Sequence, residues 1–240
     1  MRRRGRISVR LFLEERAGAQ LKAFLNIDAG ELPDEPPELY ALAHVVNVAC
    51  GGHAGDAASM KRVVAFCKQS GTAVGAHPSF PDRENFGRRA MTMTPEALGE
   101  SVAAQCALLG DVTKDVAYVK LHGALYHAAN AHADVARAAL GAAHRVLGNV
   151  TVIGPERGAI AEVAGALGLR YAREGFADRG VRADGTLVPR GEPGAMIDDP
   201  TVAAARAREL VGAVDTICVH GDGPNALAIA RAVRALLDDA

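Results

Sequence analysis

The sequence predicts an α/β fold, a distorted seven-stranded parallel (β/α) barrel of the TIM-like kind. Short apolar runs alternate with helical stretches seven times, and no interdomain linker interrupts the alternation. Runs rich in Val, Ala and Ile are typical of strands buried on both faces, and their alternation with helices is typical of a parallel sheet. A length of 240 residues suits one barrel domain. An open doubly wound sheet is the alternative, because the number of strands alone does not separate the two.

Each expected strand is a short run of Val, Ile, Leu, Ala or Cys bounded by turn-forming or helix-capping residues. None of these runs is long enough to span a membrane. In chain order the expected strands cover residues 23–27, 45–50, 72–76, 116–121, 150–153, 169–173 and 216–220.

Capping residues set the bounds of the expected helices. Asp56 is placed to cap a helix that stops before Gly71, and Thr94 with Pro95 begins another, following the preferences of those residues for the N-cap and the first helical position. After the sixth strand, the pair Asp184-Gly185 suits a type I′ turn between short extended pieces. The expected helices cover residues 37–43, 56–70, 94–109, 133–147, 158–167, 200–212 and 224–237.

Composition and charge narrow the class of protein. A net charge of −1 predicts neither nucleic acid nor an anionic membrane as a partner. The four cysteines form no CxxC pair and no signal peptide is visible, so we expect a cytoplasmic protein with reduced thiols. Residues 1–20 form a basic, Arg-rich extension, either an arm that contacts a partner or a wrongly chosen translation start, and residues 21–240 form the single catalytic domain.

Four histidines stand where an expected strand ends and a loop containing Gly or Pro begins. They are His53, His77, His122 and His220. A lone histidine is more often a hydrogen-bonded core or surface group than a functional one. The carboxyl ends of parallel strands, however, meet at one rim of a barrel, where ligands bind. Four histidines in this one context therefore indicate an active site.

Further polar residues follow the same strands. LNIDAGE brings Asn26 and Asp28, with Glu31, to the end of the first strand, and alternation places Asn26 and Asp28 on one side. Asp28 can bind a metal, orient a histidine or act as a base, or it can simply form a turn. Lys120 is costly to bury without an anion, which is either a phosphate or carboxylate of the substrate or a protein carboxylate such as Glu174.

Other loops add candidate charges. Asp222 follows His220 closely and is a candidate for orienting it as a base, while Asp178-Arg179 lies just beyond the sixth strand. Arg88 and Arg89 can hold phosphate, although a solvated basic turn is equally expected for one of them. The chain contains no GxxxxGK[ST], GxGxxG after a strand, HExxH or GxSxG, which argues against the common nucleotide loops, zincin proteases and serine hydrolases.

Seven blocks in order make a family resemblance specific. The blocks are LNIDAGE, NVACGGHAGD, VGAHPSFPD with FGRRAM, VKLHGALY, EGFADRG, LVPRGEPGAMI and TICVHGD. Together they resemble the LamB/YcsF family, that of the A subunit of the prokaryotic ATP-dependent 5-oxoprolinase, from about Ala23 to the C-terminus. The resemblance implies a barrel related to the glycoside hydrolase/deacetylase superfamily.

The resemblance also implies a reaction, the opening of the lactam of 5-oxo-L-proline to L-glutamate. ATP, with Mg²⁺, is expected to be consumed, subunits B and C are the expected partners, and no tightly bound prosthetic group is expected. An unstrained lactam resists hydrolysis, and phosphorylation of its amide oxygen makes that oxygen a good leaving group. Such a step needs cations that bind anions and a positioned acid or base.

The chain departs from the family pattern at four positions. An acidic residue is replaced by Phe24, an aromatic residue by Gly52, a proline by Leu121 and an asparagine by His127. Phe24 is the most consequential of the four, because a carboxylate lost from a strand removes a possible ligand contact.

The resulting candidate site has two groups of residues. The expected catalytic residues are Asp28, His53, His122, Glu174, His220 and Asp222, and the expected substrate or phosphate contacts are Asn26, Asn47, His77, Arg88 and Lys120. We expect His53 and His122 to matter most, with His77 and His220 shaping the rim. A metal-dependent amide or carbohydrate deacetylase, with a metal on Asp28, His53 and His122, is the second hypothesis, and a non-catalytic binding subunit is the third.

Overall fold

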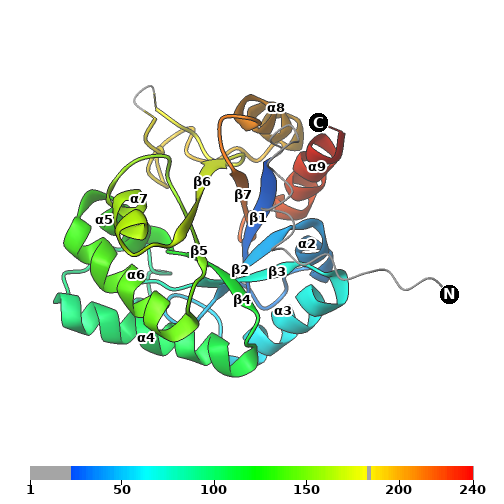
Figure 1. The fold of residues 1–240 in the computed structure, drawn as a ribbon. Coiled ribbons are helices and arrows are strands. Elements are labelled where there is room, and N and C mark those ends of the chain that lie inside the picture. Colours follow the sequence, from blue (N-terminus) through cyan, green and yellow to red (C-terminus); the bar gives the residue numbers. More distant parts are fainter. Residues whose placement is uncertain (1–22, 183–184, 240) are drawn as a thin grey trace.

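Seven parallel strands close into a barrel in the order in which they occur along the chain (Figure 1). The computed structural model describes residues 23–182 and 185–239. The last strand pairs with the first, which closes the barrel and places Asp28 opposite His220. The predicted seven-stranded parallel barrel is confirmed, and the open sheet is excluded. The strands are β1 (Phe24–Ala29), β2 (Val45–Ala49), β3 (Ala73–His77), β4 (Val116–Lys120), β5 (Thr151–Gly154), β6 (Arg170–Phe176) and β7 (Thr216–His220).

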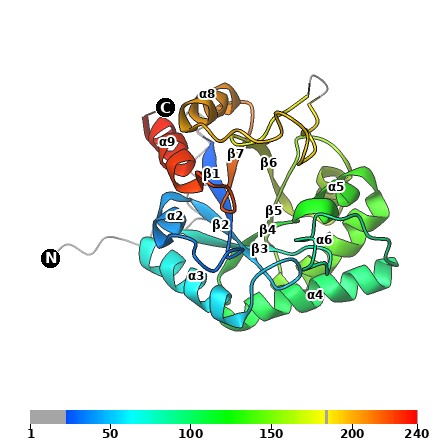
Figure 2. The ribbon, with the colours of Figure 1, turned by 180° about the vertical axis from the view of Figure 1, so that it is seen from behind.

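Helices surround the barrel and cover the outer faces of its strands (Figure 2). They are α2 (Pro37–Leu42), α3 (Ala57–Ser70), α4 (Pro95–Val112), α5 (Gly123–Ala131), α6 (Ala133–Leu147), α7 (Ala159–Ala166), α8 (Pro200–Leu210) and α9 (Ala226–Asp239). None of these described helices is both long and apolar enough to cross a membrane. The basic extension over residues 1–20 and Asp184 of the expected type I′ turn lie outside the described residues.

The predicted caps form as expected. The carboxylate of Asp56 accepts hydrogen bonds from the backbone N–H groups of Ala58 and Ser59, and Gly71 ends the same helix in the left-handed conformation with φ of 79°. The hydroxyl of Thr94 accepts from the backbone of Ala97. These caps satisfy backbone groups that a helix end leaves unpaired, so the residues define where α3 and α4 begin.

Three elements differ from the sequence-based expectation. Helix α5 was missed because it follows His122 with no side-chain cap, and its last residue is separated from α6 only by His132. Strand β1 runs two residues further than expected, because Asp28 and Ala29 pair with β2 instead of forming a turn. Strand β6 runs on to Phe176, because residues 174–176 pair with β7. Both extensions carry acidic residues into the barrel.

An apolar cluster fills the end of the barrel at which the strands begin. Phe24 at the start of β1 is 1% exposed, and its ring packs against Tyr118 with centroids 5.8 Å apart. The other buried members are Val45, Ala73, Ile153 and Ala172. Phe24 therefore lies at the opposite end of β1 from Asp28, and the effect of its replacing an acidic residue stays a prediction.

The packing of Phe24 predicts a stability effect. We expect Phe24→Ala to lower the free energy of unfolding by about 3–5 kcal/mol, because a large cavity opens in a packed core. Urea denaturation measures the change. Val202→Ala, at a position in α8 that is 52% exposed, is the control and should change stability by less than about 0.5 kcal/mol. A loss below about 1 kcal/mol for Phe24→Ala would contradict the packing described.

Candidate active site

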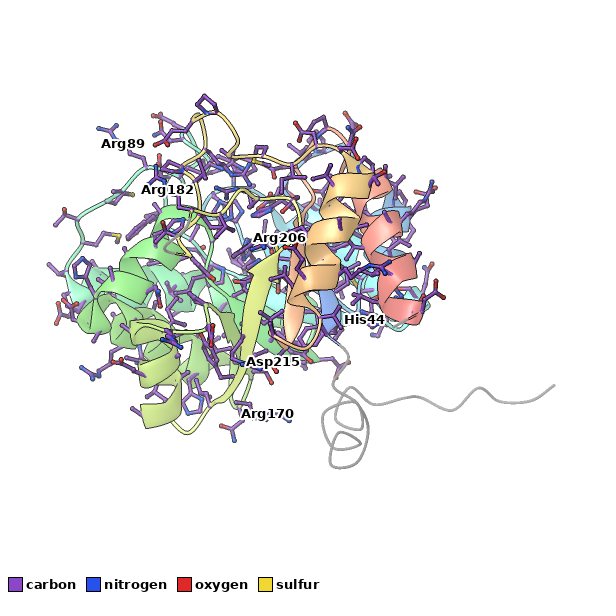
Figure 3. All side chains as sticks on the ribbon, turned by 90° about the horizontal axis from the view of Figure 1, so that it is seen from above. His44, Arg89, Arg170, Arg182, Arg206 and Asp215 are labelled. Atoms are coloured by element: carbon purple, nitrogen blue, oxygen red, sulfur yellow. The ribbon has the colours of Figure 1, made fainter. Side chains whose placement is uncertain are left out.

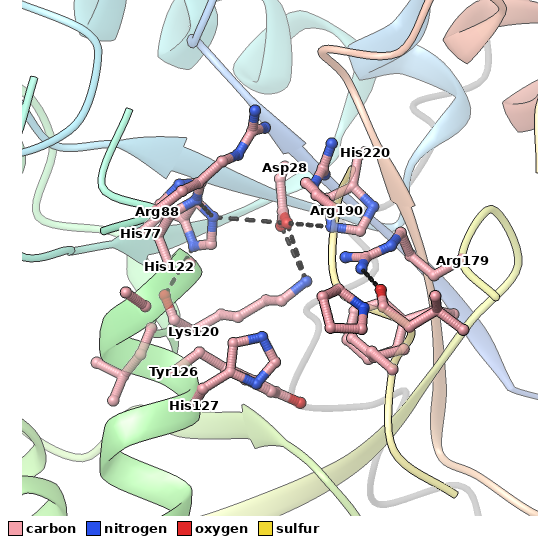
Figure 4. Close-up of a pocket in the computed structure, with 17 residues that line it drawn as sticks. Asp28, His77, Arg88, Lys120, His122, Tyr126, His127, Arg179, Arg190 and His220 are labelled. Atoms are coloured by element: carbon pink, nitrogen blue, oxygen red, sulfur yellow. Dashed lines mark hydrogen bonds and ion pairs between the residues drawn. The ribbon is translucent and has the colours of Figure 1, made fainter. Parts of the chain in front are cut away.

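A pocket of about 390 Å³ opens at the carboxyl ends of the strands (Figure 4). Its wall combines residues from the ends of β1, β3, β4 and β7 with the first turn of α5 and with residues 187–190 of the loop after β6. This is the rim at which parallel barrels bind ligands. The predicted residues that line it are Asp28, His77, Arg88, Lys120, His122 and His220.

Lys120 holds the centre of the site. Its Nζ lies 3.0 and 3.1 Å from the two carboxylate oxygens of Asp28 and 3.0 Å from Oε2 of Glu174. It also lies 3.0 Å from Sγ of Cys218. Burial disfavours the ammonium form, but Asp28, Cys218 and Glu174 outweigh it and raise the pKa of Lys120 well above its ordinary value. Glu174, the protein carboxylate expected from the sequence as a partner of Lys120, does pair with it.

Asn47 holds the Asp28 carboxylate in place and is itself bound to Asn26. Nδ2 of Asn47 donates to Oδ1 of Asp28 at 2.8 Å and to Oδ1 of Asn26 at 2.9 Å. Asn26 and Asp28 point into the barrel from the same side of β1, as alternation predicts, and Nδ2 of Asn26 donates in turn to Thr216. Burial opposes ionisation of Asp28, but His77, Lys120, His220 and the Asn47 hydrogen bond together lower its pKa. Asp28 is therefore a buried carboxylate anion.

Three histidines gather around a buried carboxylate, that of Glu31. Oε1 of Glu31 lies 2.9 Å from Nε2 of His53, 3.3 Å from Nδ1 of His122 and 3.9 Å from Nε2 of His77. The rings of His53 and His122 stack in parallel, with centroids 3.6 Å apart. Burial lowers the pKa of His53 to about 3 and that of His122 to about 4, so both rings are neutral near pH 7. Burial raises the pKa of Glu31 to about 7.

The turn that carries Glu31 is held by a second carboxylate. Gly30 takes a left-handed φ of 76° and reverses the chain after β1. The carboxylate of Glu35 accepts the backbone N–H groups of Gly30, Glu31 and Leu32 at 2.6, 2.8 and 3.0 Å, and the hydroxyl of Tyr40 at 2.9 Å. These bonds satisfy the backbone of a buried turn, so Glu31 is directed back toward the histidines.

The carboxylate that orients His220 is Asp178, not Asp222 as expected. Both carboxylate oxygens of Asp178 lie 3.0 Å from Nδ1 of His220, and Oδ2 also accepts the backbone N–H of His220 at 2.7 Å. Burial opposes protonation of His220, but Asp178 and then Asp28 outweigh it and raise its pKa. Nε2 of His220 points toward Asp28, with Oδ2 3.9 Å away (Figure 4).

Asp222 instead pairs with two arginines. Arg88 donates to Oδ2 of Asp222, and Nη2 of Arg190 lies 3.6 Å from Oδ1. Burial opposes ionisation of Asp222, but Arg190 and Arg88 lower its pKa. Arg89 is exposed and stands at the periphery of the molecule, away from the pocket (Figure 3), so it is the solvated member of the pair Arg88-Arg89.

Several predicted residues have a different position relative to the pocket from the one expected. His53 lies behind His122 and does not line the pocket, whereas His77 and His220, expected only to shape the rim, both do. The metal set expected from the sequence was Asp28, His53 and His122, but the structure places His53 and His122 in a donor group with Glu31 and His77, and Asp28 in a separate group with Cys218 and His220. Asp28 also belongs to the Lys120 ion pair.

Sequence reasoning did not select Glu31, Asp178 or Arg190 as site residues. Glu31 and Asp178 lie in motifs that were noted, LNIDAGE and EGFADRG. Both are 8% exposed or less, and an acidic residue in a turn between strand and helix normally faces solvent. Arg190 is far along a long loop, and its position against the pocket depends on how that loop folds back.

The remaining departures from the family pattern are accommodated locally. A Cβ at Gly52 would collide with the side chains of Gln105 and Ser79, so this loop has no room for an aromatic residue. Leu121 is buried beside the pocket, and His127 lines it from α5.

The fold and the site define a parallel (β/α) barrel protein with a small, charged pocket at the carboxyl ends of its strands. The chain belongs to the LamB/YcsF family, whose model matches residues 25–240. A solved structure of a lactam utilization protein from Thermus thermophilus is 35% identical, with a TM-score of 0.83, and the match covers 91% of this chain and 96% of that one. The predicted family is confirmed.

More distant barrels also match. A structure described as T48 deacetylase with substrate is 13% identical with a TM-score of 0.49, covering 91% of this chain and 85% of that one. A CE4 family pseudoenzyme from Bacillus anthracis is 10% identical with a TM-score of 0.45, covering 92% and 60%. Both scores are too low to support a conclusion about the site of this chain.

The His220–Asp178 pair predicts a pH effect. Because the folded-state pKa of His220 is raised, its protonation stabilises the fold below the ordinary value of 6.5, and this stabilisation is lost as the pH rises through the raised pKa. We expect Asp178→Asn to lower the pKa of His220 by about one unit or more. NMR titration of the imidazole C–H signals measures it.

Asp199→Asn is the matched control, because Asp199 is an exposed helix cap that an asparagine replaces well. It should leave the titration of His220 unchanged. An unchanged titration in Asp178→Asn would show that the carboxylate does not set the protonation of this histidine.

Proposed function

We propose that this chain is the A subunit of an ATP-dependent 5-oxoprolinase and that its pocket opens the lactam of 5-oxo-L-proline to L-glutamate. The observation that carries the proposal is the match to a lactam utilization protein over almost the whole of both chains, within one family. Subunits B and C are the proposed partners. The geometry of the pocket supports the proposal in three respects, namely charge, proton transfer and size.

The charge of the pocket suits an anionic ligand. Arg88 and Arg190 reach it from separate loops and share one carboxylate, Asp222, which leaves an excess of positive charge on that wall. The guanidinium of Arg179 also faces the pocket and donates to the backbone carbonyls of Val188 and Ala195. The substrate carboxylate and the phosphates of ATP are the anions that this wall would bind, since arginine binds both in bidentate fashion.

Proton transfer is available on the facing wall. Lactam hydrolysis deprotonates an attacking water and protonates the departing nitrogen. Nδ1 of His220 is engaged by Asp178, so Nε2 is the nitrogen that is free to exchange a proton at the pocket. The Asp28 carboxylate is the second proton acceptor within reach, and Lys120 beside it stabilises negative charge that develops on the substrate.

The size of the pocket fits a small substrate. A volume of about 390 Å³ is at the lower end of ligand pockets, ample for a five-membered lactam. Phosphorylation of the lactam oxygen by ATP, with Mg²⁺, would make the ring carbon more electrophilic. Attack by water and cleavage of the C–N bond would then leave an acyl phosphate, whose hydrolysis would release L-glutamate and phosphate. Within this chain, Arg88 and Arg190 are the residues proposed to hold the phosphates of ATP near the rim.

Reconstitution tests the function. The full chain is mixed with folded subunits B and C, and ATP hydrolysis and glutamate formation are measured with and without 5-oxo-L-proline. We expect little activity from the chain alone and hydrolysis that depends on 5-oxoproline once all three are present. If the complete mixture shows no dependence on 5-oxoproline, the proposal is wrong.

A substitution assigns the chemistry to this chain. We expect Asp28→Asn to lower turnover of the reconstituted enzyme by about 10²- to 10⁴-fold, the usual range for loss of a positioned acid or base. Asp199→Asn makes the same chemical change at an exposed helix cap and should keep full turnover. Assembly with subunits B and C, followed by gel filtration, must be unaffected in both variants.

The same assays decide between the other hypotheses. Normal assembly and normal turnover in Asp28→Asn would favour a non-catalytic binding subunit. Hydrolysis of an amide or acetylated sugar by the chain alone, without ATP, would favour the metal-dependent deacetylase.

A further inference from the structure

Glu31 is a buried carboxylate with an unusual set of partners. Its side chain is 1% exposed, and every ion-pair partner it has among the described residues is a histidine. Asp28, another buried carboxylate of the site, has the ammonium of Lys120 beside it. No lysine or arginine among the described residues forms an ion pair with Glu31, so no protein ammonium or guanidinium occupies the space between its carboxylate and the imidazoles.

Hydrogen bonds fix which nitrogens of two histidines face Glu31. Nδ1 of His77 lies 2.8 Å from the backbone carbonyl of Lys120, and Nε2 of His122 lies 2.9 Å from that of Phe86. A carbonyl only accepts, so both of these nitrogens carry the ring hydrogen. In a neutral ring the second nitrogen carries no hydrogen. Nε2 of His77 and Nδ1 of His122 therefore each present a lone pair. They lie 3.0 Å apart and oppose each other.

The carbonyl that fixes His122 comes from a strained residue. Phe86 has a φ of 56°, a left-handed conformation that is unfavourable for a bulky side chain. Its neighbour Gly87 packs directly against the rings, since a Cβ there would lie 2.8 Å from Cβ of His53 and 3.1 Å from Cδ2 of His122. The loop therefore keeps an unfavourable backbone conformation in which the Phe86 carbonyl accepts a hydrogen bond from His122. In the same conformation Gly87 packs against His53 and His122.

We propose that Glu31, His77 and His122 form a binding site for one divalent transition-metal ion, with His53 stacked on His122 and hydrogen-bonded to the Glu31 carboxylate at 2.9 Å. A cation between the two opposed lone pairs and the carboxylate oxygen would be bound by all three. In a tetrahedral site with metal–ligand bonds of about 2.0–2.1 Å, the ligand atoms lie about 3.3 Å from one another. Here the donor atoms are 3.3 Å apart between Glu31 and His122, 3.9 Å between Glu31 and His77, and 3.0 Å between His77 and His122.

The donor set selects the kind of metal. Imidazole nitrogens suit zinc, iron, nickel and copper, whereas magnesium prefers oxygen donors and retains water. The backbone carbonyls on the outer nitrogens of His77 and His122 are the partners that metal-binding histidines usually have. His77 and His122 also line the pocket, so an ion held by them is reached from the rim and faces a bound ligand.

A second group of possible metal donors in the barrel differs from the Glu31 group in already having a cation beside it. Asp28, Cys218 and His220 also bring their donor atoms within 4.8 Å of one another. Nζ of Lys120 already lies 3.0 Å from Cys218 and from Asp28, so an ammonium stands where an ion would bind. The Glu31 group holds no such cation among the described side chains. The metal site is inferred for the Glu31 group alone, and it does not depend on the reaction proposed above.

Direct binding tests the inference. The full chain is treated with a chelator and titrated with Zn²⁺, Co²⁺ and Mg²⁺ by calorimetry, and the visible spectrum is recorded with Co²⁺. We expect one Zn²⁺ or Co²⁺ per chain, a Co²⁺ spectrum typical of nitrogen ligands, and no comparable binding of Mg²⁺. Glu31→Gln and His122→Ala should weaken Zn²⁺ binding by about 100-fold or more.

Matched variants separate loss of the site from loss of the fold. His132→Ala removes an exposed histidine between α5 and α6 and should bind Zn²⁺ as the unchanged chain does. Zn²⁺ should raise the melting temperature of the unchanged chain and of His132→Ala, but not that of Glu31→Gln, whose side chain keeps the shape of glutamate. Zn²⁺ binding of equal strength in Glu31→Gln, or no stoichiometric binding in the unchanged chain, would overturn the inference. In the second case a shared proton between His77 and His122 would explain their contact.

Discussion

The ammonium of Lys120 inside the barrel is the interaction on which the rest of the site depends. It comes from β4 and contacts Asp28 on β1, Glu174 on β6 and Cys218 on β7, so one side chain joins four strands across the lumen. Two carboxylates at this depth would repel each other without it. Breaking such a buried pair by removing one partner typically costs about 3–5 kcal/mol, so the charged centre and the barrel are stable only together.

The closure of the barrel places the remaining groups around this centre. Pairing of β1 with β7 sets Asp28 beside His220, and pairing of β1 with β2 sets it beside Asn47. Asp28, Asn47 and His220 therefore lie at one level of the barrel although they are far apart in the sequence. The register of the paired strands thus assembles the pocket. One of its walls carries arginines, and the other carries imidazoles and carboxylates.

Much of the fold and part of the site were predictable from the sequence. Alternating apolar runs indicate strands, and residues such as Asp56 and Thr94 mark helix starts through local hydrogen bonds. Lys120 was predictable as a buried charge that needs an anion. The partners were not, because Glu31 and Asp178 become buried only when turns fold back over the rim. Helix α5 carries no capping signal, so its start follows from tertiary packing alone.

The apolar cluster at the start of the strands affects the route by which a ligand can enter and leave the pocket. Phe24, Tyr118 and the other members of the cluster fill the lumen at that end, so among the described residues the pocket opens at the carboxyl ends of the strands. A ligand would enter and leave across that rim. A partner protein that binds over the rim would then control access to the pocket, and ligand exchange would have to wait for its docking and release. In such a complex, the order in which ligand and partner protein bind would affect the rate of ligand exchange.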